Sequence, residues 1–167
     1  MENKKMKKKS KILFLCQGAV IAAAYVVLTY ITHLFGLDAG MIQLRASEML
    51  CILPMFTTAA IPGLYVGCLL ANLLTGAVWL DVLAGPIATL LGALGTYALR
   101  KHKWLAPLPP IAANTIIVPF VLAYGYGVEQ AIPFMMLTVG IGEILSIYLL
   151  GMIFCFAISK HASRIFK

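Results

Sequence analysis

The segment at residues 43–48 places a basic and an acidic side chain between two long apolar runs. Arg45 and Glu48 are three residues apart, so on a helix they would share one face. Glu48 would lie in the first turn of a membrane helix, where an ionisable group is costly and is therefore a candidate functional residue. A carboxylate in this position can accept hydrogen bonds from a bound solute.

Glu143 is a second acidic residue with the same potential, because it falls near the middle of the last apolar run. A carboxylate at that depth needs a partner or a proton, which favours a functional role over a structural one. Asn72 and Asn114 are the two asparagines within the apolar runs, and such residues more often hydrogen-bond between helices than contact a ligand. Asn114 is predicted to lie in the cytoplasmic third of its helix, away from Glu48.

The composition bounds the class of protein. The 167 residues are 62% hydrophobic and 11% charged, which indicates an integral membrane protein without room for a second soluble domain. The formal charge of +7 is concentrated at the predicted membrane edges, so it does not indicate nucleic-acid binding. The chain lacks the P-loop, the H-E-x-x-H and the G-x-S-x-G motifs. We therefore predict a solute binder or carrier, not an enzyme, with no cofactor and no metal.

Six apolar runs predict six transmembrane helices, since helices and closed barrels are the structures that satisfy their backbone in a bilayer. The run at 49–80 would be roughly 48 Å long as one helix, which is too long, and Pro62 and Gly63 are predicted to divide it. The predicted spans are 12–35, 45–61, 64–80, 82–99, 111–128 and 131–159. A basic tail at 1–11 precedes this domain of 12–159, and a second basic tail follows at 160–167.

The distribution of Lys and Arg predicts the orientation. With six spans, twelve of the 13 basic residues fall on one side, namely in both tails and in the loop after the fourth span, with Arg45 alone opposite. Both termini are thus predicted to be cytoplasmic. The outer side is net negative, with Asp38, Asp81 and Glu129. This acidity either attracts cations to the outer mouth or simply reflects the exclusion of Lys and Arg, and the sequence leaves both readings open.

The first span carries two overlapping pairs of small residues four apart, Gly18 with Ala22 and Ala19 with Ala23. Small residues let helix backbones approach closely in a membrane. The partner of this face is either another helix of the chain or a second subunit, and the spacing alone does not decide between them.

Four segments resemble the QueT family, the substrate-binding S components of energy-coupling factor (ECF) transporters assigned to queuosine precursors. They are IQLRASE at 42–48, AIPGLYVGCLLAN at 60–72, DVLAGPIAT at 81–89 and GEILSIYLLG at 142–151. The resemblance implies a six-helix S-component bundle in the bacterial plasma membrane. It also implies a transmembrane coupling subunit and two cytoplasmic ATPases as partners. Ala19 and Ala23 match the alanine-rich face that contacts the coupling subunit in that class.

The implied substrate is a 7-deazaguanine such as 7-aminomethyl-7-deazaguanine or queuine. Its guanine-type edge offers N–H donors that carboxylates accept, and its flat ring suits an aromatic platform such as Trp79, Tyr124 or Tyr126. The predicted substrate-binding residues are Arg45, Glu48, Asn72, Trp79, Asp81, Tyr124 and Glu143, and the predicted partner-docking residues are Gly18, Ala19, Ala22 and Ala23. Alternatives are an S component for another vitamin, a stand-alone proton-coupled transporter using Glu143, and a scaffold that carries no solute.

Overall fold

The computed structural model describes residues 2–38 and 42–162, and every regular element within them is helical. The tail residues Arg164 and Lys167 lie outside the described residues. The chain forms α1 (Glu2–Leu34), the 3-10 helix η1 (Ala46–Met55), α2 (Ala60–Leu74), α3 (Trp79–Ala98) and α4 (Leu108–Tyr124). It ends in one continuous helix made of α5 (Ile132–Glu143), the π-helix η2 (Ile144–Leu150) and α6 (Gly151–Ser159). The predicted all-α class is confirmed.

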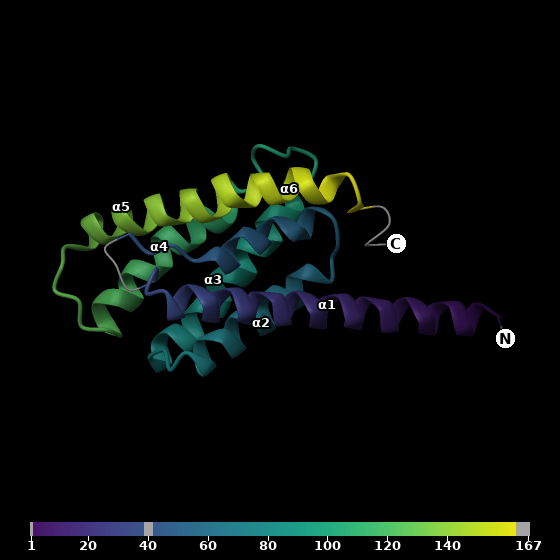
Figure 1. The fold of residues 1–167 in the computed structure, drawn as a ribbon, viewed down its shortest axis with the longest axis horizontal. Helices are drawn as coiled ribbons and strands as arrows, with labels where there is room; N and C mark the ends of the chain where they lie inside the picture. The colour runs from purple at the N-terminus through teal and green to yellow at the C-terminus, as the bar shows by residue number, and fades with distance from the viewer. Residues whose placement is uncertain (1, 39–41, 163–167) are drawn as a thin grey trace.

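Three stretches are long and apolar enough to cross a membrane, namely Ser10–Leu34, Trp79–Ala98 and Ile132–Ser159. The elements η1, α2 and α4 are apolar but shorter. Successive elements run back and forth along the bundle, and the start of α1, the loop between α3 and α4 and the end of α6 lie toward the same end (Figure 1). The helical class and the three long apolar stretches are those expected of a membrane protein.

The predicted second span at 45–61 is wrong as a single α-helix. Arg45 is extended, and the helix that follows is the ten-residue 3-10 helix η1 with Pro54 inside it. Proline lacks the N–H that an α-helix needs and disfavours helical geometry in the residue before it, so the helix ends at Met55. Pro62, which was expected to break the run, lies in the first turn of α2, where no intrahelical N–H bond is required.

The predicted boundary between the third and fourth spans, at residue 81, is also wrong. α2 ends at Leu74 in a Schellman motif, in which the N–H of Ala77 donates to Asn72 O at 2.9 Å and that of Gly76 to Leu73 O at 3.4 Å. Gly76 has φ of +71°, a conformation that glycine adopts without a Cβ penalty. α3 therefore begins at Trp79, and Asp81 lies in its first turn.

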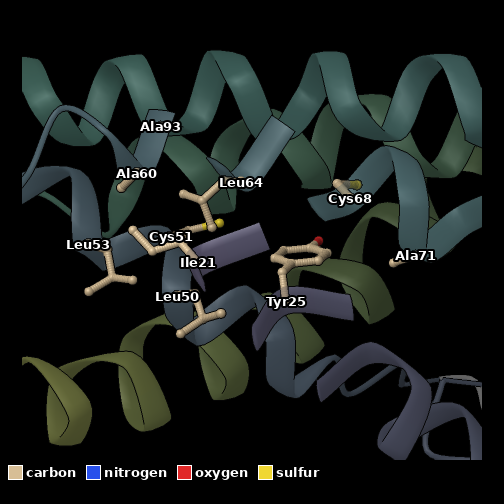
Figure 2. Packing of buried hydrophobic residues seen from close by; sticks show 10 residues of the cluster. All are labelled: Ile21, Tyr25, Leu50, Cys51, Leu53, Ala60, Leu64, Cys68, Ala71 and Ala93. Carbon is tan, nitrogen blue, oxygen red and sulfur yellow. The ribbon is translucent and has the colours of Figure 1, made fainter. Parts of the chain in front are cut away.

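Close packing of α1 on α2 forms the centre of the fold. A Cβ at Gly63 would lie 2.7 Å from Gly18 O, and one at Gly67 would lie 2.8 Å from the Tyr25 Cβ and 3.1 Å from the Ala22 Cα. Figure 2 shows the buried cluster beside this contact, in which Tyr25 packs together with side chains of α1, η1, α2 and α3. Gly18 and Ala22 thus pack within the chain, whereas Ala19 and Ala23 are exposed.

This packing predicts that Gly67→Val destabilises the protein by about 1–3 kcal/mol, because the added carbons overlap Tyr25 and the backbone of α1. Ala23→Val, on the exposed face of α1, should change stability by less than about 0.5 kcal/mol. Unfolding of the detergent-purified variants measures both effects. Equal stability of the two variants would contradict the α1–α2 contact.

Candidate functional site

A cluster of polar side chains lies buried inside the bundle. Glu48 of η1 and Glu143 at the end of α5 are only 2% and 5% exposed. The Asn114 Nδ2 atom of α4 lies 3.3 Å from Glu48 Oε2 and 3.0 Å from Glu143 Oε2, so one amide donates to both carboxylates. The Tyr25 hydroxyl of α1 donates to Glu48 Oε1. We call Tyr25, Glu48, Asn114 and Glu143 the carboxylate cluster.

The two carboxylates of the cluster differ in how many donors they have. Glu48 accepts from the Tyr25 hydroxyl at one oxygen, and from Asn114 and the Cys51 thiol, whose Sγ lies 3.2 Å away, at the other. Glu143 accepts a single hydrogen bond from within the described residues, that of Asn114. A carboxylate can accept about four hydrogen bonds, so Glu143 retains the greater capacity for a solute.

An extended segment ahead of η1 brings Glu48 to this position. Arg45 has φ of −112° and ψ of 100°, and its backbone N–H donates to Ser146 Oγ of η2 at 3.2 Å. The absence of a side chain at Gly142 lets the carbonyl of Gln43 approach the last helix, since a Cβ there would overlap that carbonyl oxygen. The segment therefore lies directly against the helix that carries Glu143.

A second polar group consists of Arg45, Asp81 and Tyr126, and we call it the outer ion pair after the side of the membrane predicted for it. Arg45 Nη2 lies 3.7 Å from Asp81 Oδ2, and the Tyr126 hydroxyl donates to the same oxygen at 3.2 Å. Asn72 Nδ2 donates to the backbone carbonyl of Asp81 at 3.0 Å. The prediction that Arg45 and Glu48 share a helical face is wrong, because Arg45 is extended and the helix begins after it.

An open pocket of about 340 Å³ lies beside the outer ion pair and includes two of its residues. Arg45 and Tyr126 line it, and at its rim His33 Nδ1 lies 2.9 Å from Asp38 Oδ2. The remaining lining residues are Gln43, Leu122 and Val128. The lining combines charged and polar side chains with the apolar Leu122 and Val128, which suits a flat heterocycle with polar edges.

The predicted aromatic platform lies elsewhere. The side chains of Trp79 and Tyr124 are 72% and 76% exposed. Tyr124 stacks on Phe120, with the ring centroids 6.5 Å apart. Trp79 lies two residues before Asp81, which places the two side chains on different faces of α3. The structure therefore does not bring Trp79 or Tyr124 to the carboxylate cluster. Tyr126, two residues beyond Tyr124, does reach Asp81.

Sequence reasoning misplaced Asn114 and missed Tyr25. Asn114 was expected away from the acidic residues, but it lies between both carboxylates. The expectation assumed that α4 begins at residue 111, whereas it begins at Leu108 and Asn114 is correspondingly deeper in the bundle. Tyr25 carried a usable signal, because it lies three residues after Ala22 on the small-residue face of α1, where a large polar-tipped side chain is unusual.

Comparison with known proteins places these residues in a family. The model of the family described as "QueT transporter" matches residues 15–160. A protein of Lactococcus lactis subsp. cremoris (strain MG1363), described as "Queuosine precursor transporter QueT", is 36% identical over 97 residues. That alignment covers 58% of this chain and 57% of the relative, so the match spans little more than half of the relative's length. No solved structure matches the chain.

The carboxylate cluster predicts that Tyr25→Phe lowers the free energy of unfolding by about 1–3 kcal/mol, because it removes a donor from the buried Glu48. Tyr30→Phe is the matched control, since Tyr30 lies on the same helix with an exposed ring, and should be nearly neutral. Unfolding in detergent without added solute measures the difference. A Tyr25→Phe variant as stable as the control would show that Tyr25 does not support Glu48.

Proposed function

The chain belongs to the QueT transporter family, and we propose on that basis that it binds an amine-bearing 7-deazaguanine, a queuosine precursor, for transport across the membrane. The family description and the name of the Lactococcus lactis relative support this substrate class. Within the chain, the observation that carries the proposal is the buried pair of Glu48 and Glu143 around Asn114. In this role the chain is a transport protein and not an enzyme.

The charges around the pair favour a cationic solute. Two carboxylates that share one amide repel each other when both are ionised, and burial strengthens that repulsion. Arg45, the cation nearest in sequence, forms its ion pair with Asp81. An ammonium group on the solute would balance the negative charge, whereas a neutral solute would leave it uncompensated. Amine-bearing 7-deazaguanines provide such a group.

The hydrogen-bonding capacity of Glu143 favours a solute with several N–H donors. Glu143 has one donor among the described residues, so its remaining lone pairs are available to the adjacent N–H groups of a guanine-type edge or to an ammonium. The outer pocket, with Arg45 and Tyr126 in its wall, would be the entrance from the outer side. In this proposal the solute passes from that pocket to the carboxylate cluster.

We further propose that the protein acts as the S component of an ECF importer, with a coupling subunit and two cytoplasmic ATPases as partners. The absence of a P-loop from this sequence means that ATP energy would come from other subunits. Ala19 and Ala23 are exposed on α1, and Ala19 lines an apolar groove of about 200 Å³ with Pro62 and Val66. Such a small-residue surface allows close approach of a partner helix.

The same proposal includes a multi-pass protein of the bacterial plasma membrane with six spans and cytoplasmic termini. Basic residues support this orientation, because they are concentrated in the sequence at the start of α1, in the loop between α3 and α4 and after α6, and these parts lie toward one end of the bundle (Figure 1). Under this orientation the outer ion pair and its pocket face outward. The chain is then divided into a basic tail at 1–11, a membrane domain at 12–159 and a basic tail at 160–167.

Glu143→Gln should weaken binding of 7-aminomethyl-7-deazaguanine by about 2–4 kcal/mol, on the order of 30- to 1,000-fold, because an acceptor becomes a donor aimed at the solute's donors. Glu129→Gln, an exposed substitution of the same type, should leave affinity unchanged. Isothermal titration of the purified proteins measures both.

The wild type should also bind the neutral 7-cyano-7-deazaguanine at least tenfold more weakly than the amine. Equal affinity for the two compounds, or a Glu143→Gln variant within threefold of wild type, would contradict the assignment of the carboxylate pair. Glu143 is a cleaner test than Glu48, whose oxygens already accept from three protein donors.

Ala19→Leu and Ala23→Leu should abolish uptake and copurification of the coupling subunit while leaving solute binding intact, because a larger side chain blocks close helix approach. Ala112→Leu is the control, at an exposed position on α4. Copurification of the coupling subunit with either α1 variant would contradict the proposal that Ala19 and Ala23 contact that subunit. Uptake by the wild type in a host without ECF ATPases would instead indicate a stand-alone transporter.

A further inference from the structure

The last helix changes its hydrogen bonding halfway along. It runs as an α-helix to Glu143, as the π-helix η2 from Ile144 to Leu150, and as an α-helix again from Gly151. A π-helix bonds residue i to residue i+5, so it holds more residues per turn than an α-helix. Glu143, whose carboxylate belongs to the cluster, is thus the last residue before the π-helix.

The buried residues of this helix show the same insertion. One buried row has steps of four residues except for a single step of five, from Ser146 to Gly151, which lies across η2; the row is Thr138, Gly142, Ser146, Gly151 and Cys155. In a regular α-helix, Gly142 and Gly151 would lie about half a turn apart around the axis. The wider π turns return Gly151 to the face that Gly142 and Ser146 occupy.

At Gly142, Ser146 and Gly151 this face contacts the backbone that leads into and through η1. A Cβ at Gly142 would overlap the Gln43 carbonyl oxygen, and one at Gly151 would lie 3.4 Å from Met49 O. Between them, Ser146 Oγ accepts the Arg45 N–H at 3.2 Å. The last helix therefore contacts residues 43–49 both before and after η2. The extra residue in η2 keeps α5 and α6 facing this same segment.

We propose that η2 is the positioning element of the binding site: its extra residue holds Glu143 against Asn114 while α6 keeps its separate packing. This inference rests on the proposed function, since it takes Glu143 as a solute ligand. Without the extra residue, one half of the helix would turn by about 100° and shift by about 1.5 Å relative to the other. The half after η2, α6, is anchored by Met152 and Cys155, which pack on Ile52 and Ala106. The half before η2, α5, would therefore rotate and move Glu143 away from Asn114.

Deletion of Leu149 tests this directly. Its side chain is 55% exposed, so the deletion shortens η2 without removing a core residue. We expect affinity for 7-aminomethyl-7-deazaguanine to fall at least 100-fold in isothermal titration. Leu149→Ala, which keeps the residue count, should bind within threefold of wild type. Wild-type affinity in the deletion variant would overturn the proposal, as would an equal loss in Leu149→Ala.

A second pair of variants carries the test if the deletion does not fold. In Gly142→Ala the added methyl group overlaps the Gln43 carbonyl oxygen and pushes α5 away from it, so the affinity should fall at least tenfold. In Gly140→Ala the methyl group would lie 3.4 Å from Thr115, an ordinary contact, so the affinity should not change. Equal binding by these two variants would also overturn the proposal. Failure of the wild type itself to bind the amine would contradict the proposed function instead, which separates the two conclusions.

Discussion

Two buried carboxylates that share one amide are the constraint on which the rest of this structure depends. Glu48 and Glu143 come from elements 95 residues apart in sequence, and Asn114 connects them. A bundle in a membrane cannot leave such groups unpaired, so the surrounding elements supply Tyr25 and Cys51 as further donors. Arg45 forms its ion pair with Asp81, which is not a member of the carboxylate cluster.

Irregular backbone is what brings the two carboxylates together. Residues 43–45 form no regular element, with Arg45 extended, and lead into a 3-10 helix, while η2 is a π-helix on the facing element. Such backbone is tolerated at membrane depth only where protein encloses it. Here α1, α3 and the last helix enclose it, and glycines at 142 and 151 allow the backbones to approach. Both departures from α-helical geometry therefore occur in elements that carry or directly follow a carboxylate of the cluster.

The sequence was sufficient for the helical class, for the extent of the first and last apolar runs, and for Glu48 and Glu143 as ionisable residues within predicted spans. These predictions rest on hydropathy and on the cost of burying charge, which are local properties. The 3-10 helix was not predictable in this way, because a run of apolar residues has the same hydropathy in any helix. The positions of Asn114 and Tyr25 depended on which helix faces meet, and those faces are set by glycine contacts between elements distant in sequence.

Identification of the small molecule that copurifies with the wild-type chain tests the central claim most directly. The protein would be purified under mild conditions from cells grown with a mixture of amine-bearing and neutral 7-deazaguanines, and the released compounds identified by mass spectrometry. The carboxylate cluster predicts selective recovery of a compound with an ammonium group, in a ratio of about one per chain. Recovery of a neutral or anionic compound in that ratio would contradict the account.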